Sequence, residues 1–130
     1  MGVVEHITIE GAPDPIAPFS HACSAGHLVF LTGQMPIDPN SGELVAGEIE
    51  TQTIRVMENL KIVLNGMGLD LSDVVSARAF LTDMGDYEAF NSTYRSFFDP
   101  DKLPARTCIG VVGLALGAKV EVDFIASKDK

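Results

Sequence analysis

Apolar and polar positions along the chain follow two periods. Stretches in which apolar residues are β-branched or alternate with polar ones predict strands. These stretches lie at 4–10, 19–25, 27–32, 74–81, 109–112 and 118–126. Apolar residues three and four positions apart predict two helices, over 48–67 and 86–98. The second predicted helix carries an aromatic stripe, which we interpret as core: Tyr87, Phe90, Tyr94, Phe97 and Phe98.

The predicted order, β-β-β-α-β-α-β-β, indicates an α+β fold with two helices on one face of a mixed sheet. The last two apolar runs are bounded by glycines, so we expect them to pair as one hairpin. Two helices cover only one face of the sheet and leave the other face bare, yet the strands carry more apolar residues than the covered face can bury. Four of these additional apolar residues are Val29, Leu31, Val111 and Ile125. The pattern therefore predicts an oligomer packed sheet to sheet.

Length and composition indicate one domain spanning 1–130. The 46% hydrophobic content is enough for a core, and no apolar run is long enough to span a membrane. The N-terminus lacks the pattern of a secretory signal, so we expect a cytoplasmic chain. Cys23 and Cys108 are then expected to stay reduced. The net charge of −9 disfavours a nucleic-acid partner.

The histidines do not indicate a metal site. His6, His21 and His27 show no ligand spacing on a helix, and only His21 and Cys23 would share a face of a strand. We interpret the histidines as exposed or hydrogen-bonded within the fold, and we expect no metal.

The strongest chemical signal is Arg106, in a strand that is otherwise mostly apolar. Alternation places Arg106 and Cys108 on one strand face, and Glu121 and Asp123 together on one face of the next strand. Arg106 could form a structural ion pair with Glu121 or Asp123. Alternatively, its guanidinium could grip a ligand carboxylate through two parallel hydrogen bonds, while Glu121 holds or deprotonates a water. The residues alone leave both readings open.

Two further side chains border this region. Cys108 lacks a nearby histidine to activate it, so we interpret it as a buried strand residue whose backbone carbonyl could accept a ligand proton. Asn91 follows the core position Phe90 and could hydrogen-bond at the edge of the buried face.

Five short motifs resemble those of the RidA family, also called YjgF or L-PSP endoribonuclease-like proteins. In order and spacing, the resemblance covers nearly the whole chain. The motifs are Ala17-Pro18-Phe19, Thr32-Gly33-Gln34-Met35-Pro36, Asn91-Ser92-Thr93-Tyr94, Pro104-Ala105-Arg106-Thr107-Cys108 and Val120-Glu121-Val122. The resemblance implies a chorismate-mutase-like two-layer unit. It also implies a homotrimer whose sheets form an inner barrel, with a ligand cleft at each subunit interface.

Family members with this arginine resemble enamine/imine deaminases, which convert 2-aminoacrylate and related imines to 2-keto acids and ammonia. The resemblance implies that Arg106 binds the substrate carboxylate and that Glu121 orients the attacking water. The Cys108 main chain would contact the imine nitrogen, and Asn91 and Gly33 would line the cleft. No cofactor is expected, because an imine is already electrophilic and positioning suffices.

The chain departs from the most familiar family pattern at Phe19, where many members have tyrosine, and at Thr32, where they have serine. Losing the phenol removes a hydrogen-bond donor, typically worth about 0.5–1.5 kcal/mol. These changes bear on the substrate range, and they keep a second hypothesis open, a non-catalytic module that binds a small carboxylate or a protein. RNA cleavage, the source of the family's older name, ranks third because the chain is acidic.

Overall fold

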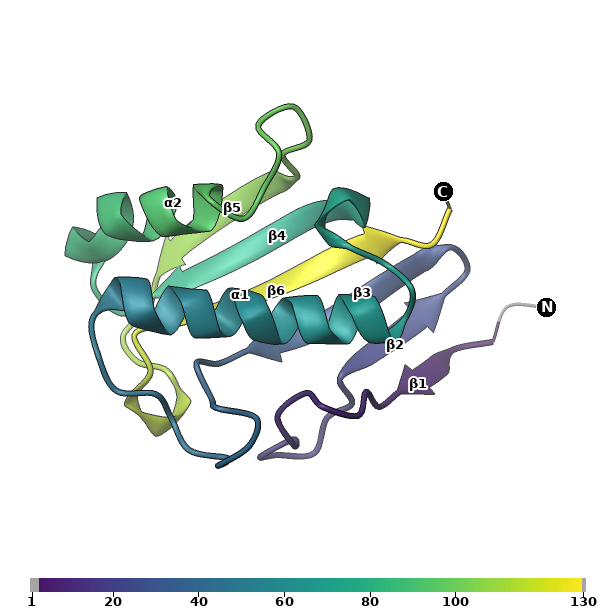
Figure 1. Cartoon of the computed structure of the whole chain (residues 1–130), viewed down its shortest axis with the longest axis horizontal. Coiled ribbons are helices and arrows are strands. Elements are labelled where there is room, and N and C mark those ends of the chain that lie inside the picture. Colours follow the sequence, from purple (N-terminus) through teal and green to yellow (C-terminus); the bar gives the residue numbers. More distant parts are fainter. Residues whose placement is uncertain (1–2, 130) are drawn as a thin grey trace.

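The computed structural model describes residues 3–129, so residues 1, 2 and 130 of the predicted domain lie outside the described part. The predicted order of elements is confirmed (Figure 1). The strands are β1 (Glu5–Ile7), β2 (Ala22–Ala25), β3 (Leu28–Gln34), β4 (Val74–Leu81), β5 (Ala105–Gly110) and β6 (Val120–Ser127). The two α-helices are α1 (Ile49–Gly66) and α2 (Tyr87–Arg95).

The strands form one mixed sheet in the order β1-β2-β3-β6-β4-β5. The predicted hairpin of the last two strands is wrong, because β4 lies between β5 and β6. Strand β5 instead pairs parallel to β4 at the sheet edge, and β6 runs antiparallel to both β3 and β4. A parallel pair needs a long crossover, which the segment containing α2 supplies between β4 and β5. The apolar pattern identifies a strand but does not identify its neighbour.

Both helices cover the same face of the sheet, as predicted (Figure 1). Helix α1 buries its apolar stripe completely against this face: Val56, Met57, Leu60, Val63 and Leu64. Val29 and Leu31 point into this core, so their predicted place on the bare face is wrong. The stripe of α1 needs apolar partners across the layer, and these two β3 residues supply them.

The opposite face of the sheet carries exposed apolar side chains together with one ion pair. Phe30 on β3 is 45% exposed and Ile109 on β5 is 44% exposed. Across β4 and β6, the Arg78 guanidinium donates to both Asp123 carboxylate oxygens, at 3.0 and 2.7 Å. This hydrogen bond raises the pKa of Arg78. Asp123 therefore already has a cationic partner on the bare face.

A β-bulge interrupts the pairing of β3 with β6. Leu31 pairs with Phe124 but Gln34 pairs with Val122, so β3 has one residue more than β6 across this step. The extra residue falls at Thr32 and Gly33. Bulges bend a strand locally and redirect its side chains, which places an irregular backbone beside Glu121 on β6.

A buried amide fixes the segment that follows β3. Asn59 on α1 is fully buried, and its Nδ2 donates to the carbonyl oxygens of Met35 and Ile37 at 3.1 and 2.9 Å. Its Oδ1 accepts from Arg55 Nε at 3.0 Å. This segment cannot pair within the sheet, so the Asn59 side chain satisfies its carbonyls instead.

We expect Asn59→Leu to lower the free energy of unfolding by about 1–3 kcal/mol, because it leaves the Ile37 carbonyl without its donor, whereas the Met35 carbonyl keeps the Ile37 backbone N–H. Chemical denaturation measures this change. The control is Asn65→Leu, at an exposed position of the same helix, with an expected change within about 0.5 kcal/mol. Equal effects at both positions would contradict the role given to Asn59.

No helix within residues 3–129 is both long and apolar enough to cross a membrane.

Candidate functional site

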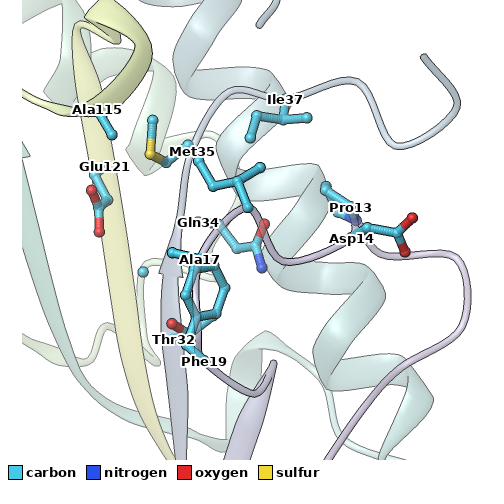
Figure 2. Close-up of a pocket in the computed structure, with 12 residues that line it drawn as sticks. Pro13, Asp14, Ala17, Phe19, Thr32, Gln34, Met35, Ile37, Ala115 and Glu121 are labelled. Carbon is cyan, nitrogen blue, oxygen red and sulfur yellow. The ribbon is translucent and has the colours of Figure 1, made fainter. Parts of the chain in front are cut away.

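Two surface hollows contain all the sequence-predicted site residues except Cys108. The first, the Glu121 hollow, has a volume of about 240 Å³. Its lining includes Phe19, Thr32 and Glu121 (Figure 2). Gly33 lines it as well. The second, the Arg106 hollow, also has a volume of about 240 Å³. It is lined by Asn91, Tyr94, Arg95, Leu103, Pro104 and Arg106.

Arg106 lies on a bed of aromatic rings supplied by α2. Its guanidinium carbon is 5.8, 5.6 and 5.1 Å from the ring centres of Tyr87, Phe90 and Tyr94. Its Nη2 donates to the Tyr87 hydroxyl oxygen at 3.3 Å. Cation–π attraction and this hydrogen bond orient the guanidinium without neutralising it. The aromatic stripe predicted as core thus also supports the Arg106 guanidinium.

The structural ion pair considered for Arg106 is wrong for both partners. Within residues 3–129, Arg106 forms no ion pair with either acid, and Asp123 pairs with Arg78 instead. The register explains why. Arg106 lies beside Ala77, which is buried under the helices, whereas Glu121 lies beside Phe80 on the bare face. Arg106 and Glu121 therefore belong to opposite faces of one sheet.

The Arg106 hollow also contains two buried polar atoms without partners. Among the described residues, Asn91 Oδ1 and the Tyr94 hydroxyl find no hydrogen bond. Burial raises the pKa of Tyr94 to about 12, against the opposing effect of the Arg106 charge. The hydroxyl therefore keeps its proton and is a donor at neutral pH. Buried polar groups are normally hydrogen-bonded. Next to the Arg106 cation, the Tyr94 hydroxyl can donate to a ligand anion, whereas Asn91 Oδ1 can only accept, for example from a ligand N–H.

Asn91 borders the buried face, as predicted, whereas the sequence reasoning missed Tyr94 and Tyr87 as site residues. The sequence feature that could have identified these two residues is the tyrosine hydroxyl. Two positions of an otherwise phenylalanine stripe carry a hydroxyl, and a buried tyrosine usually needs a partner for it.

Glu121 is held against a glycine on the bare face. A Cβ added at Gly33 would overlap the Glu121 carboxylate, so only glycine permits this close approach of β3 and the side chain. Burial raises the pKa of the Glu121 carboxyl, and the neighbouring Asp123 charge raises it further. Its proton affinity is thereby brought nearer to the range useful for acid–base chemistry.

Cys108 lies beside Ala79 on the helix-covered face of the sheet, as Arg106 does. Burial raises the pKa of its thiol, and the Arg106 charge and a backbone hydrogen bond at Ile109 offset this only in part. A protonated thiol is a poor nucleophile, as the sequence interpretation expected. Cys108 lies in strand β5, but it is only partly buried, so its predicted full burial is wrong. Cys108 and Cys23 are both free cysteines.

His21 anchors the segment that forms one wall of the Glu121 hollow. Its ring is buried, with Nδ1 accepting from the Ile9 backbone N–H and Nε2 donating to the Pro13 carbonyl, both at 2.8 Å. Both ring nitrogens are thus used, as the sequence interpretation expected. His6 Nδ1 lies 3.4 Å from Cys23 Sγ. Within residues 3–129, no three side chains of His, Cys, Asp or Glu are grouped as metal ligands.

Comparison with known proteins identifies the family. Residues 9–128 match the family model described as Endoribonuclease L-PSP. The chain belongs to the RidA/YjgF family. A RutC family protein of Pyrococcus horikoshii is 42% identical over 125 residues, covering 96% of this chain and 98% of the relative.

Two further relatives carry informative descriptions. The chloroplastic Reactive Intermediate Deaminase A of Arabidopsis thaliana is 37% identical, with 95% of this chain aligned to 65% of the relative. A crystal structure of Escherichia coli TdcF with bound serine superposes with a TM-score of 0.85 at 32% identity, covering 93% of this chain and 98% of the other. These similarities confirm the family and the fold that the sequence motifs imply.

We expect Tyr94→Phe to raise the free energy of unfolding by about 1 kcal/mol, because it removes a buried hydroxyl that lacks a partner. Tyr87→Phe is the matched control. It removes a hydroxyl that accepts from Arg106, so it is expected to lower stability by about 0.5–1.5 kcal/mol. Denaturation of the ligand-free protein measures both, and loss of stability in Tyr94→Phe would show that its hydroxyl is already satisfied.

The raised pKa of Glu121 predicts a pH-dependent stability difference. The folded chain binds this proton more tightly than the unfolded chain, whose value is near 4.5. The stabilising contribution of Glu121 is therefore present below about pH 4.5 and lost as the pH rises through the folded-state pKa. Glutamine does not titrate, so Glu121→Gln should melt at a higher temperature than the native chain at pH 7.5.

This advantage should disappear near pH 4, where the carboxyl is protonated in both states. Thermal denaturation at the two pH values measures it. Glu10→Gln, at an exposed position, is the control for the loss of one surface carboxylate. A Glu121→Gln chain less stable than the native one at pH 7.5 would refute the burial argument.

Proposed function

We propose that this protein hydrolyses 2-imino acids, and the enamines that tautomerise to them, to 2-keto acids and ammonia. The observation that carries the proposal is the Arg106 guanidinium, which lies on the aromatic rings of α2 beside the buried Tyr94 hydroxyl and, within residues 3–129, has no carboxylate partner. A bidentate ligand carboxylate fits this arrangement. The name of the Arabidopsis relative and the serine bound to TdcF support the same class of ligand.

Since Arg106 and Glu121 lie on opposite faces of one sheet, we place the reaction between two copies of the chain. The Arg106 hollow of one copy would face the Glu121 hollow of the next. The exposed Phe30 and Ile109 on the bare face support association through that face. A homotrimer, as the family resemblance implies, closes such a head-to-tail arrangement and gives three equivalent sites.

In the proposed reaction, Arg106 holds the carboxylate and so fixes the imine carbon near Glu121 of the adjoining copy. Glu121 accepts a proton from water as the water oxygen bonds to that carbon. The C=N π electrons move to nitrogen, which takes up the proton that Glu121 received from the water. The resulting tetrahedral intermediate then collapses: Glu121 takes the hydroxyl proton and delivers it to nitrogen as the C–N bond breaks. Ammonia leaves, and the carbon becomes the carbonyl of the 2-keto acid.

Each group has a defined part in this scheme. The raised pKa of Glu121 suits a carboxyl that takes a proton from water and returns it to the leaving nitrogen. The Cys108 main chain would contact the imine nitrogen, and its protonated thiol takes no part. Gly33, Thr32 and Phe19 would line the cleft on the Glu121 side.

The first test compares Arg106→Ala and Arg106→Lys with the native chain. An amino-acid oxidase generates imines, and semicarbazide traps whatever survives. Arg106→Ala should lose about 100-fold or more of kcat/KM, because positioning supplies much of the rate. Arg106→Lys keeps the positive charge but lacks the two parallel N–H donors of the guanidinium, so its decrease in kcat/KM should be smaller but measurable. Unchanged turnover in Arg106→Ala, with assembly intact by sedimentation, would refute the proposal.

Co-expression of Arg106→Ala with Glu121→Gln tests whether the site spans two copies. In mixed trimers, about one interface in four would pair an intact Arg106 with an intact Glu121. Activity should therefore return to roughly a quarter of the native value, although each variant alone is inactive. A site confined to one chain would give no recovery.

Ligand binding without catalysis would distinguish the second hypothesis, a non-catalytic binding module, from the deaminase. Small 2-keto acids that bind in an Arg106-dependent manner, without any faster imine hydrolysis, would identify a carboxylate-binding module. The departures at Phe19 and Thr32 are the features that favour this alternative.

A further inference from the structure

The Glu121 hollow has an apolar wall that the proposed chemistry does not use. Ile16 and Phe19 are 48% and 41% exposed, and they face the hollow together with Met35 and Ile37, which are nearly buried. Figure 2 shows Phe19, Met35 and Ile37 around the space next to Glu121. Exposed apolar side chains that line a concave surface normally receive an apolar ligand group.

The polar groups of this hollow favour an apolar ligand group as well. Its two charged groups are the carboxylates of Asp14 and Glu121, on opposite sides of the space (Figure 2). Both repel an acidic side chain, and the net charge of −9 adds to that repulsion. Among the described residues of the same chain, no lysine or arginine lines the hollow, and the Arg106 that the adjoining copy would bring to it is taken up by the substrate carboxylate. Thr32 and Gln34 offer the uncharged polar groups.

The size of the hollow suits more than a methyl group. Its volume of about 240 Å³ is many times the roughly 10–15 Å³ that one water molecule requires. A branched side chain of four carbons therefore has room beside Glu121. The phenylalanine at position 19 extends the apolar wall where a tyrosine would present a hydroxyl.

We propose that the Glu121 hollow binds the side chain of the 2-imino acid. It selects apolar side chains of about four carbons, such as that of leucine, over polar side chains of the same shape, such as those of asparagine and aspartate. This inference rests on the proposed function, with the carboxylate at Arg106 and the reacting carbon near Glu121. The substrates are then the imines that oxidation of apolar amino acids releases.

Selectivity is measured first by binding, which does not depend on turnover. Calorimetric titration compares the 2-keto acids that correspond to leucine, asparagine and aspartate: 4-methyl-2-oxopentanoate, 2-oxosuccinamate and oxaloacetate. The three side chains have nearly the same shape, so differences report polarity and charge. We expect 4-methyl-2-oxopentanoate to bind at least about tenfold more tightly than either polar acid. Pyruvate, with only a methyl group, should bind more weakly than 4-methyl-2-oxopentanoate.

Ile16→Lys tests the wall itself, because this exposed residue should accept a lysine without loss of folding. The variant should reverse the order of 4-methyl-2-oxopentanoate and oxaloacetate, since an ammonium group replaces apolar surface beside the ligand. Ile54→Lys is the matched control: Ile54 is also 48% exposed but lies on α1, away from the hollow. It should keep the native order. Phe19→Tyr should reduce the ratio of the affinities for 4-methyl-2-oxopentanoate and 2-oxosuccinamate.

Imine turnover with the same side chains separates this inference from the proposed function. If alanine imine is hydrolysed but the 2-keto acids bind equally, or if Ile16→Lys keeps the native order, the side-chain assignment is wrong and the reaction stands. If no imine is hydrolysed while the binding order and its reversal are as expected, the assignment stands and the reaction is wrong.

Discussion

Along β5, β4 and β6, successive side chains point to opposite faces of the sheet. This alternation decides which charged side chains can contact each other. In-register pairing of β5, β4 and β6 sets Arg106 beside Ala77 and Glu121 beside Phe80. The first pair lies under the helices and the second on the bare face. Because the strand period is two, no side-chain rotation brings Arg106 and Glu121 together through the sheet. A reaction that needs both groups therefore needs a second copy of the chain.

Local contacts hold Arg106 and Glu121 in place without an ion pair to either side chain within the described residues. On one face, the rings of α2 hold the guanidinium of Arg106 by cation–π contacts, so that no carboxylate of the same chain has to neutralise it. On the other face, the bulge at Gly33 admits the carboxylate of Glu121, while Arg78 takes up the charge of Asp123. The same sheet thus separates the Arg78–Asp123 ion pair from the charged groups of Arg106 and Glu121, and Phe19 and Ile16 add apolar surface beside Glu121.

Most secondary structure was predictable because it depends on local pattern. The strand at 74–81 was predicted to the residue, and the first helix to within one residue at each end. Strand pairing was not predictable in the same way. The sequence shows that 109–112 and 118–126 are apolar and glycine-bounded, but β6 pairs with β3 and β4, far away in the chain. The same limit misplaced Val29 and Leu31, because the face that a strand buries depends on where the helices pack.

The sequence by itself determined the element order and the family, and it named six of the residues that line the two hollows, because period, glycine placement and short motifs are properties of neighbouring positions. Only the tertiary structure decided how those residues are grouped. Among the described residues, Asp123 forms its ion pair with Arg78, and Arg106 lies against the aromatic rings of α2. The Tyr94 hydroxyl is buried there without a hydrogen-bond partner. These outcomes depend on strand register and on which face the helices cover, and both are set by contacts between residues distant in the chain.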